Sequence, residues 1–182
     1  QTILPIYAQD IRDYSALQSG MLLLPGAVLM GIMNPIAGKL FDKFGGRWLS
    51  IFGFASIVVS ETLFMSLGMH TPLVLISMMF MFMSAGISLV MMPLTTAGIN
   101  ALPYELIAHG TAMINTIRMV GGSIGTAILI SIMSSGSTTN QTLQGMLGGM
   151  HSAFLVAGLI ALVGFLVSFT IHRKSVSLGA NR

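Results

Sequence analysis

The sequence predicts an all-α protein, a polytopic bundle that crosses a membrane with about five helices. Its composition is the first reason: of 182 residues 54% are hydrophobic and only 7% are charged, whereas a soluble domain carries about 25% charged residues. So few charges cannot cover a surface that faces water, and lipid is therefore the expected solvent for most side chains. The second reason is that long apolar runs are present in place of the ~10-residue alternating strands of a membrane β-barrel.

The helices are expected where about 20 mainly apolar residues follow one another, because this length crosses the hydrocarbon core of a bilayer. Five such runs are residues 16–41, 48–68, 72–93, 109–134 and 151–172. The links between them are residues 42–47, 69–72, 94–108 and 135–150, and residues 173–182 form a tail. Short links make neighbouring helices antiparallel, and residues 1–182 are expected to form one domain.

Basic residues predict which helix ends face the cytoplasm, because cytoplasmic loops of membrane proteins are enriched in Lys and Arg. Most of the basic residues lie around the first link or in the tail: Lys39, Lys43, Arg47, Arg173, Lys174 and Arg182. The link at 135–150 carries none. We therefore expect a cell-membrane protein whose N-terminus is outside and whose tail is cytoplasmic, which agrees with an odd number of spans.

The composition argues against several classes of function. The sequence has no cysteine, which excludes disulfides, thiolate metal sites and cysteine nucleophiles. Its four histidines are scattered without paired acidic ligands, and neither H-E-x-x-H nor a phosphate-binding G-x-x-x-x-G-K-[ST] occurs. The basic residues form no stripe of the kind that binds nucleic acid. We expect no enzyme activity, no cofactor, no metal and no nucleic-acid partner.

The strongest local signal is the segment of residues 38–47, which we name the gating loop. Its informative positions are Gly38, Asp42, Lys43, Gly45, Gly46 and Arg47. The glycines allow a tight turn, and the aspartate can face a helix N-terminus or a basic neighbour and so hold one conformation closed. An ordinary basic cytoplasmic turn is the alternative interpretation. The order of these residues resembles the loop motif of the major facilitator superfamily.

Other segments resemble multidrug exporters of the fourteen-helix drug:proton antiporter group of that superfamily. They are Leu4-Pro5-Ile6-Tyr7, Gln9, Ser19-Gly20, Leu24-Pro25-Gly26, Asn115, Arg118, Gly121-Gly122-Ser123-Ile124-Gly125, Ala127-Ile128 and His151-Ser152-Ala153-Phe154. The resemblance covers nearly the whole chain and implies a partial major facilitator fold, the last five helices of the transporter. Helices two to six of the N-terminal half are the alternative placement. They would carry an arginine in the third helix and a Gly-Pro-rich motif in the fourth, and neither is present.

The resemblance implies efflux of hydrophobic or cationic drugs, coupled to proton influx by alternating access. The first, third and fourth runs would contribute to the cavity wall. The implied partners are membrane lipid, small hydrophobic substrates, protons, and N-terminal transporter helices that would precede Gln1, because the chain begins without an initiator methionine. The alternatives are a membrane scaffold or assembly subunit without transport activity, and a uniporter or an importer on the same fold.

Two charged residues inside the apolar runs are candidates for proton coupling or for the gate. Glu61 lies roughly 20 Å along its helix from Trp48, at ~1.5 Å per residue, and a charge at a helix centre costs about 2.5–3.5 kcal/mol. Burial favours the neutral carboxyl, which suits a proton-coupled step or a hydrogen-bonded group in the scaffold. Arg118 either organises a cytoplasmic gate or reaches the interface with its long side chain. Their estimated depths differ, so no ion pair between them is expected.

Small and flexible residues in the third and fourth runs give weaker signals. Gly121 and Gly125 form a G-x-x-x-G spacing beside Gly122, and we expect them to allow close packing inside the bundle rather than dimerisation. The third run holds Met78, Met79, Met81 and Met83. Flexible thioethers suit a polyspecific cavity, but at 100° per residue these side chains cannot all face one way, so core and lipid-facing packing is the favoured interpretation.

Overall fold

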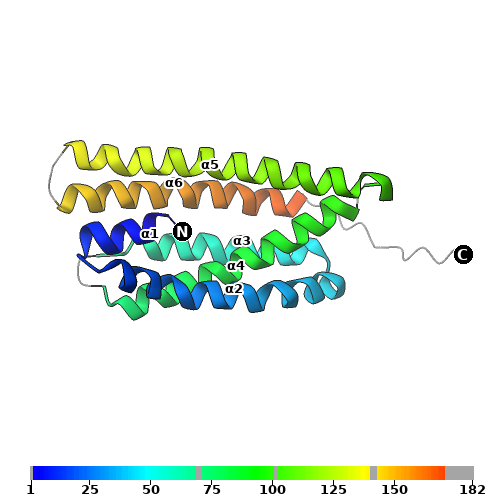
Figure 1. The fold of residues 1–182 in the computed structure, drawn as a ribbon, viewed down its shortest axis with the longest axis horizontal. Coiled ribbons are helices and arrows are strands. Elements are labelled where there is room, and N and C mark those ends of the chain that lie inside the picture. Colours follow the sequence, from blue (N-terminus) through cyan, green and yellow to red (C-terminus); the bar gives the residue numbers. More distant parts are fainter. Residues whose placement is uncertain (1, 69–70, 101, 140–142, 171–182) are drawn as a thin grey trace, which may run out of the picture.

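The computed structural model describes residues 2–68, 71–100, 102–139 and 143–170, and these are mainly helical (Figure 1). The elements are α1 (Ile3–Ile6), the π-helical turn η1 (Tyr7–Ile11), α2 (Ala16–Phe44), α3 (Gly46–Phe64), α4 (Leu73–Asn100), the 3-10 turn η2 (Tyr104–Leu106), α5 (Ile107–Thr139) and α6 (Leu143–Thr170). Five of the described helices, α2 to α6, are long and apolar enough to cross a membrane. The all-α class and the bundle of about five spans are confirmed.

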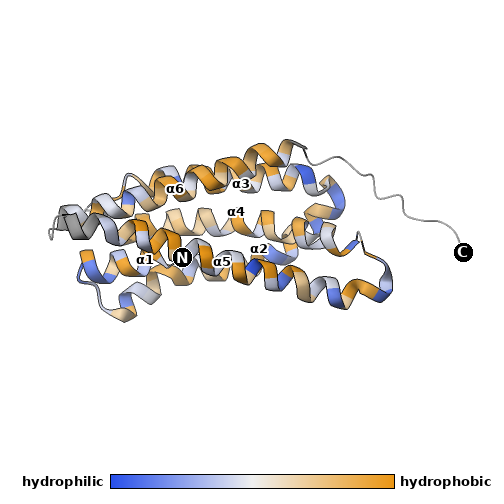
Figure 2. Cartoon of the chain, turned by 90° about the horizontal axis from the view of Figure 1, so that it is seen from above, coloured by the Kyte–Doolittle hydropathy of each residue, from blue (hydrophilic) through white to orange (hydrophobic). Residues whose placement is uncertain are grey.

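The five long helices lie side by side along the long axis of the molecule, and successive helices run antiparallel (Figure 1). α4 packs between α2 and α3, α3 packs against α6 on its other side, and α6 packs along α5. α5 meets α4 over a smaller area. The apolar residues follow the lengths of the helices, and many of the hydrophilic residues lie towards the two ends (Figure 2), as a bilayer requires.

Glycines let α3 and α4 approach with their backbones in contact. A Cβ atom at Gly53 would lie 2.8 Å from the carbonyl oxygen of Gly86, and one at Gly86 would lie 2.9 Å from that of Gly53. In contrast, a Cβ atom at Gly121, Gly122 or Gly125 would meet nothing within 4 Å in the described part of the chain. Close packing at these three glycines is therefore not made by the described part of this chain, and the expectation stays a prediction for the complete protein.

Several helices continue through residues that we expected to form links. α2 reaches Phe44 and α3 begins at Gly46, so the first link shrinks to Gly45. α4 continues past Pro93 to Asn100, and α5 and α6 cover most of the polar stretch at 135–150. Serine and threonine can donate to carbonyls one turn back in the same helix, so polar residues need not end it. The positions of His172 and of the tail at 173–182 lie outside the described residues.

The end of α3 on the side expected to face outward is closed by α1, η1 and α6, and the sequence analysis missed the first two. Residues 3–11 were not assigned a helix, yet α1 and η1 pack there. The phenol of Tyr7 in η1 donates to the carbonyl of Gly68 at 2.8 Å, and Nε2 of His151 in α6 lies 2.9 Å from the carbonyl oxygen of Leu67. The last carbonyls of a helix lack partners within it. Tyr7 and His151 satisfy two carbonyls just beyond α3.

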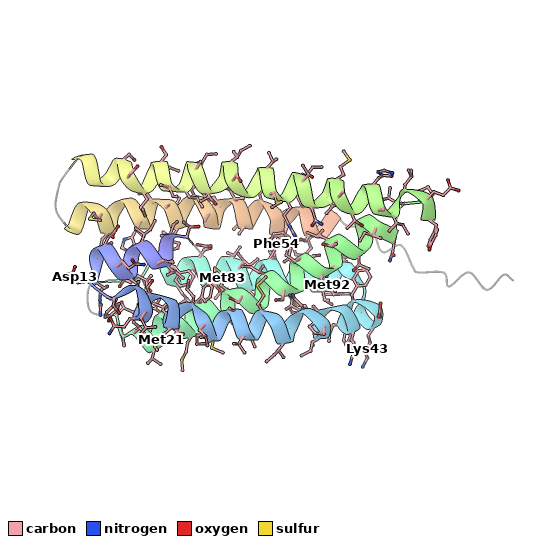
Figure 3. All side chains as sticks on the ribbon, viewed as in Figure 1. Asp13, Met21, Lys43, Phe54, Met83 and Met92 are labelled. Carbon is pink, nitrogen blue, oxygen red and sulfur yellow. The ribbon has the colours of Figure 1, made fainter. Side chains whose placement is uncertain are left out.

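The methionines of α4 divide between core and surface, as the favoured interpretation expected. Met79 and Met83 are buried, at 8% and 6% exposed. Met83 lies within the bundle in Figure 3, whereas Met78 is 61% exposed. These side chains therefore do not share one cavity.

Candidate functional site

A cavity of about 460 Å³ lies between α2 and α4, and we name it the α2–α4 cavity. Its walls are formed by Leu23, Ala27, Met30, Gly31 and Asn34 of α2 and by Phe80 and Ser84 of α4. Ser84 is only 1% exposed, and within the described residues its Oγ has no hydrogen-bond partner. Buried hydroxyls normally have a partner, so this one is available to a guest in the cavity.

Glycine and proline residues of α2 shape the α2–α4 cavity. A side chain at Gly26 would clash with Phe80 and with the Ser84 hydroxyl, so glycine is required for α4 to approach there. Gly31 leaves open space beside it. Pro35 lies inside α2 and has no N–H to donate to the Gly31 carbonyl one turn earlier. The cavity therefore combines apolar walls with the Ser84 hydroxyl and the Asn34 amide.

The gating loop forms a corner between two helices. Gly45 ends α2 with φ +78° and its N–H donates to the Phe41 carbonyl at 2.8 Å, a backbone conformation that favours glycine. A Cβ atom at Gly46 would lie 2.9 Å from the Phe41 ring, whereas Gly38 has only an ordinary contact with Met92. The tight turn therefore requires glycine at Gly45 for its backbone conformation and at Gly46 for the close approach of Phe41.

The charged residues of the gating loop lie at the surface of this corner. Lys43 stands in the last turn of α2 (Figure 3), where the helix dipole favours a positive charge. Asp42 is exposed and Arg47 is half-buried. Among the residues that the structure describes, Asp42 forms no ion pair, so the contact that would close a gate is not made in this conformation.

Glu61 is buried at the interface between α3 and α6. It is 9% exposed, and its Oε2 has no hydrogen-bond partner among the described residues. A Cβ atom built at Gly158 would lie 3.4 Å from the Cβ of Glu61. Gly158 is close to the middle of α6, so Glu61 lies at mid-bundle depth even though α3 ends three residues later. The Cβ of Glu61 lies against α6, and Glu61 is not among the residues that line the α2–α4 cavity.

Arg118 lies on α5, and its side chain contacts residues of α4 and α5. One guanidinium nitrogen donates to Oδ1 of Asn115 at 3.1 Å, and another lies 3.9 Å from the sulfur of Met91 on α4. The side chain is exposed. In the described residues Arg118 contacts α4 and its own helix, whereas Glu61 lies between α3 and α6.

Sequence reasoning missed the polar members of the α2–α4 cavity and of the α3 end. Asn34 and Ser84 stand inside apolar runs, and a polar residue at such a position is a signal that could have found them. Tyr7 and His151 were noted only for their resemblance to family segments. Their roles depend on Leu67 and Gly68, which are distant in sequence, so no local pattern predicts the contacts.

Comparison with known proteins identifies the family. The sequence pattern of the Major Facilitator Superfamily matches residues 1–126. YcnB, an uncharacterized MFS-type transporter of Bacillus subtilis (strain 168), is 53% identical over 95% of this chain and 37% of its own length. The lincomycin resistance protein LmrB of the same organism is 37% identical over 96% of this chain and 39% of its own length. The riboflavin transporter RibZ of Clostridioides difficile (strain 630) is 22% identical over 95% of this chain and 39% of its own length.

The chain spans less than two fifths of the length of these curated relatives. The matched residues include α1 to α4 and more than half of α5. Five apolar helices agree with a multi-pass membrane transporter. The chain therefore belongs to the major facilitator superfamily.

Proposed function

We propose that this chain forms the C-terminal helical bundle of a proton-driven drug exporter. The α2–α4 cavity is the observation that carries the proposal. Its volume of about 460 Å³ falls in the range of about 300–1,000 Å³ that is typical of small-molecule sites. Apolar walls with a few polar groups suit a hydrophobic drug that carries a hydrogen-bonding group. The relative named for lincomycin resistance supports a drug as the substrate.

The face of α5 that points away from this bundle supports alternating access, because another part of the transporter could pack on it. Within the most apolar stretch of α5 the structure buries no residue. Its large exposed side chains at intervals of three or four residues are Met113, Ile117, Val120, Ile124 and Ile128. This spacing places them on one helix face, next to Gly121. We propose that N-terminal helices of the longer transporter cover this face in one state and separate from it in the other.

Specific residues would carry the gate and the coupling step. The gating loop would contact the partner bundle when the cytoplasmic side is closed, through Asp42, Lys43 and Arg47. Arg118, with Asn115 beside it, would organise the same side of α5. Glu61 would take up and release the coupled proton, because a buried carboxyl without a partner is costly to keep charged. The proposed orientation keeps the gating loop cytoplasmic.

Export is tested in cells that lack their main efflux pumps and produce the complete transporter. We expect them to accumulate less lincomycin than control cells, with the difference removed by a protonophore. Asn34→Leu should weaken the apparent affinity about tenfold, since one buried hydrogen bond contributes about 0.5–1.5 kcal/mol. Asn100→Leu, at the exposed end of α4, is the matched control. Equal accumulation in all strains would contradict the proposal.

The coupling role of Glu61 needs a separate measurement. In vesicles with an imposed pH gradient, Glu61→Gln should abolish the dependence of drug uptake on that gradient while drug binding persists. Glu105→Gln, in the exposed turn η2, should behave like the unchanged protein. Drug uptake with an unaltered pH dependence in Glu61→Gln would remove this residue from the mechanism.

An importer is the second candidate. RibZ is named a riboflavin transporter, and the same cavity would accept an aromatic ring system with polar edges. Riboflavin uptake by the complete protein in a riboflavin-requiring strain would favour this alternative. Transport of neither compound in either direction would favour the membrane scaffold.

A further inference from the structure

A second cavity lies at the corner between α2 and α3, apart from the α2–α4 cavity. We name it the corner cavity. Its volume is about 340 Å³, and its lining residues are Leu40, Phe44, Trp48, Leu49, Phe52 and Leu89. All of these are apolar, and they come from α2, α3 and α4. The corner cavity is therefore suited to a hydrocarbon rather than to a polar ligand.

The aromatic side chains that line the corner cavity are exposed at the surface of the protein. Phe44, Trp48 and Phe52 are 52%, 51% and 63% exposed. The rings of Trp48 and Phe52 stack at 6.2 Å between centroids. Tryptophan is enriched where the hydrocarbon of a bilayer meets its headgroups. The position of Trp48 in the first turn of α3 places the mouth of the corner cavity at this boundary.

Three basic residues belong to the segment that forms this corner. Lys39, Lys43 and Arg47 lie within ten residues that contain one acidic residue, Asp42. The ammonium group of Lys43 lies 5.4 Å from the centroid of the Phe44 ring, and Phe44 is a wall of the corner cavity. In the described part of the chain none of these three basic residues forms an ion pair. Their positive charge is available to an anion at the mouth.

We propose that the corner cavity binds an anionic phospholipid. One acyl chain enters between Leu49 and Leu89, and the phosphate lies against Lys43 with its basic neighbours. Basic pockets between transmembrane helices bind anionic headgroups in this way. The excess of positive charge distinguishes this occupant from a zwitterionic lipid, whose headgroup gains less from it. The inference does not depend on whether the protein exports drugs.

Native mass spectrometry of the complete transporter tests the site. The detergent-purified protein is titrated with phosphatidylglycerol and with phosphatidylcholine that carry the same acyl chains. We expect phosphatidylglycerol to be retained preferentially. Lys43→Gln should lower this preference about fivefold, and Lys39→Gln with Lys43→Gln should lower it further. Arg12→Gln, at the opposite end of the bundle, is the control and should leave the preference unchanged. Equal retention of both lipids, or an unchanged preference in the double variant, would overturn the proposal.

A cavity-filling variant tests the acyl-chain part independently. Leu89→Trp should occupy the corner cavity and reduce retention of both lipids, whereas Leu17→Trp, on an exposed face of α2, should not. Both variants are first checked for an unchanged helical circular dichroism spectrum, and Leu89→Phe replaces Leu89→Trp if the larger ring prevents folding. Full phosphatidylglycerol retention in the filled variant would show that the headgroup binds elsewhere and would overturn the assignment of this cavity.

Discussion

α4 and α5 are both long enough to cross a membrane, but they are packed in different ways. Of the most apolar stretch of α4, 44% of residues are buried inside the bundle, whereas none are in α5. Both helices carry glycine, yet a Cβ atom at Gly86 would meet the α3 backbone, whereas one at Gly121 would meet no described residue within 4 Å. Apolar composition therefore shows that a helix leaves water, but not whether it packs in its own bundle, against lipid or against a partner.

The largest effect is expected from alanine at the glycines where α3 meets α4. Gly53→Ala and Gly86→Ala place a Cβ atom against a carbonyl oxygen of the facing backbone, and we expect each to destabilise the protein by about 1–3 kcal/mol. Gly121→Ala should be neutral or slightly stabilising, because alanine is the better helix former. Thermal unfolding in detergent measures the difference. Equal transition temperatures for all three variants would show that α3 and α4 do not approach so closely.

A smaller effect is expected from Glu61, which lies on the side of α3 that faces α6. Glu61→Met should raise stability by about 1–2 kcal/mol, because it removes a buried polar group whose Oε2 has no partner in the described chain. Glu105→Met, in an exposed turn, should not change it. The same unfolding assay gives both values. A lower transition temperature in Glu61→Met would mean that the carboxyl has a partner in the complete protein.

A further prediction concerns the hydrogen bond between η1 and the turn that follows α3. Tyr7→Phe removes the hydroxyl that donates to the Gly68 carbonyl at 2.8 Å, and we expect a loss of about 1 kcal/mol. Tyr104 is 90% exposed, so Tyr104→Phe is the control and should have no effect. Hydrogen exchange of the first amides of α4 provides a local readout. Unchanged protection there in Tyr7→Phe would exclude the hydrogen bond.

The smallest effect is expected from serine on the two compared helices. Ser84→Ala on α4 should raise stability by less than about 1 kcal/mol, because the buried hydroxyl has no partner among the described residues. Ser123 of α5 donates to its own helix at the Met119 carbonyl, and Ser123→Ala should leave stability unchanged. Calorimetry without drug measures both. Clear destabilisation by Ser84→Ala would indicate that the hydroxyl is already satisfied in the complete protein.

Hydropathy and residue spacing were sufficient to predict the class and most of the spans, because a bilayer imposes a minimum apolar length on every crossing. They failed at the helix ends. The polar stretch at 135–150 is largely helical, in α5 as far as Thr139 and in α6 from Leu143, and Ser135 donates to the Ile132 carbonyl of its own helix. α1 and η1 were missed because residues 3–11 are too few to form a span.

The candidate site could be predicted only where neighbouring residues in the sequence determine the structure. The turn at Gly45 follows from a backbone conformation that favours glycine, and its residues were found. The α2–α4 cavity depends on which face of α2 meets α4, and this is set by packing between distant segments. Glycine does allow close helix packing here, at Gly53 and Gly86, where the backbones of α3 and α4 meet. The sequence spacing points instead to Gly121 and Gly125.

The most direct test of alternating access at α5 and the α2–α4 cavity is the accessibility of single cysteines. They are easily introduced because this sequence has none. In the complete transporter, free of other cysteines, we would place one at Asn34, at Gly121 or at Val163, which is 59% exposed on α6. The labelling rate with a membrane-impermeant maleimide is measured with and without drug. We predict that the rate changes with drug at 34 and 121, and that position 163 stays unlabelled in lipid. A residue at 121 as inert as that at 163 would contradict a role for α5 in alternating access.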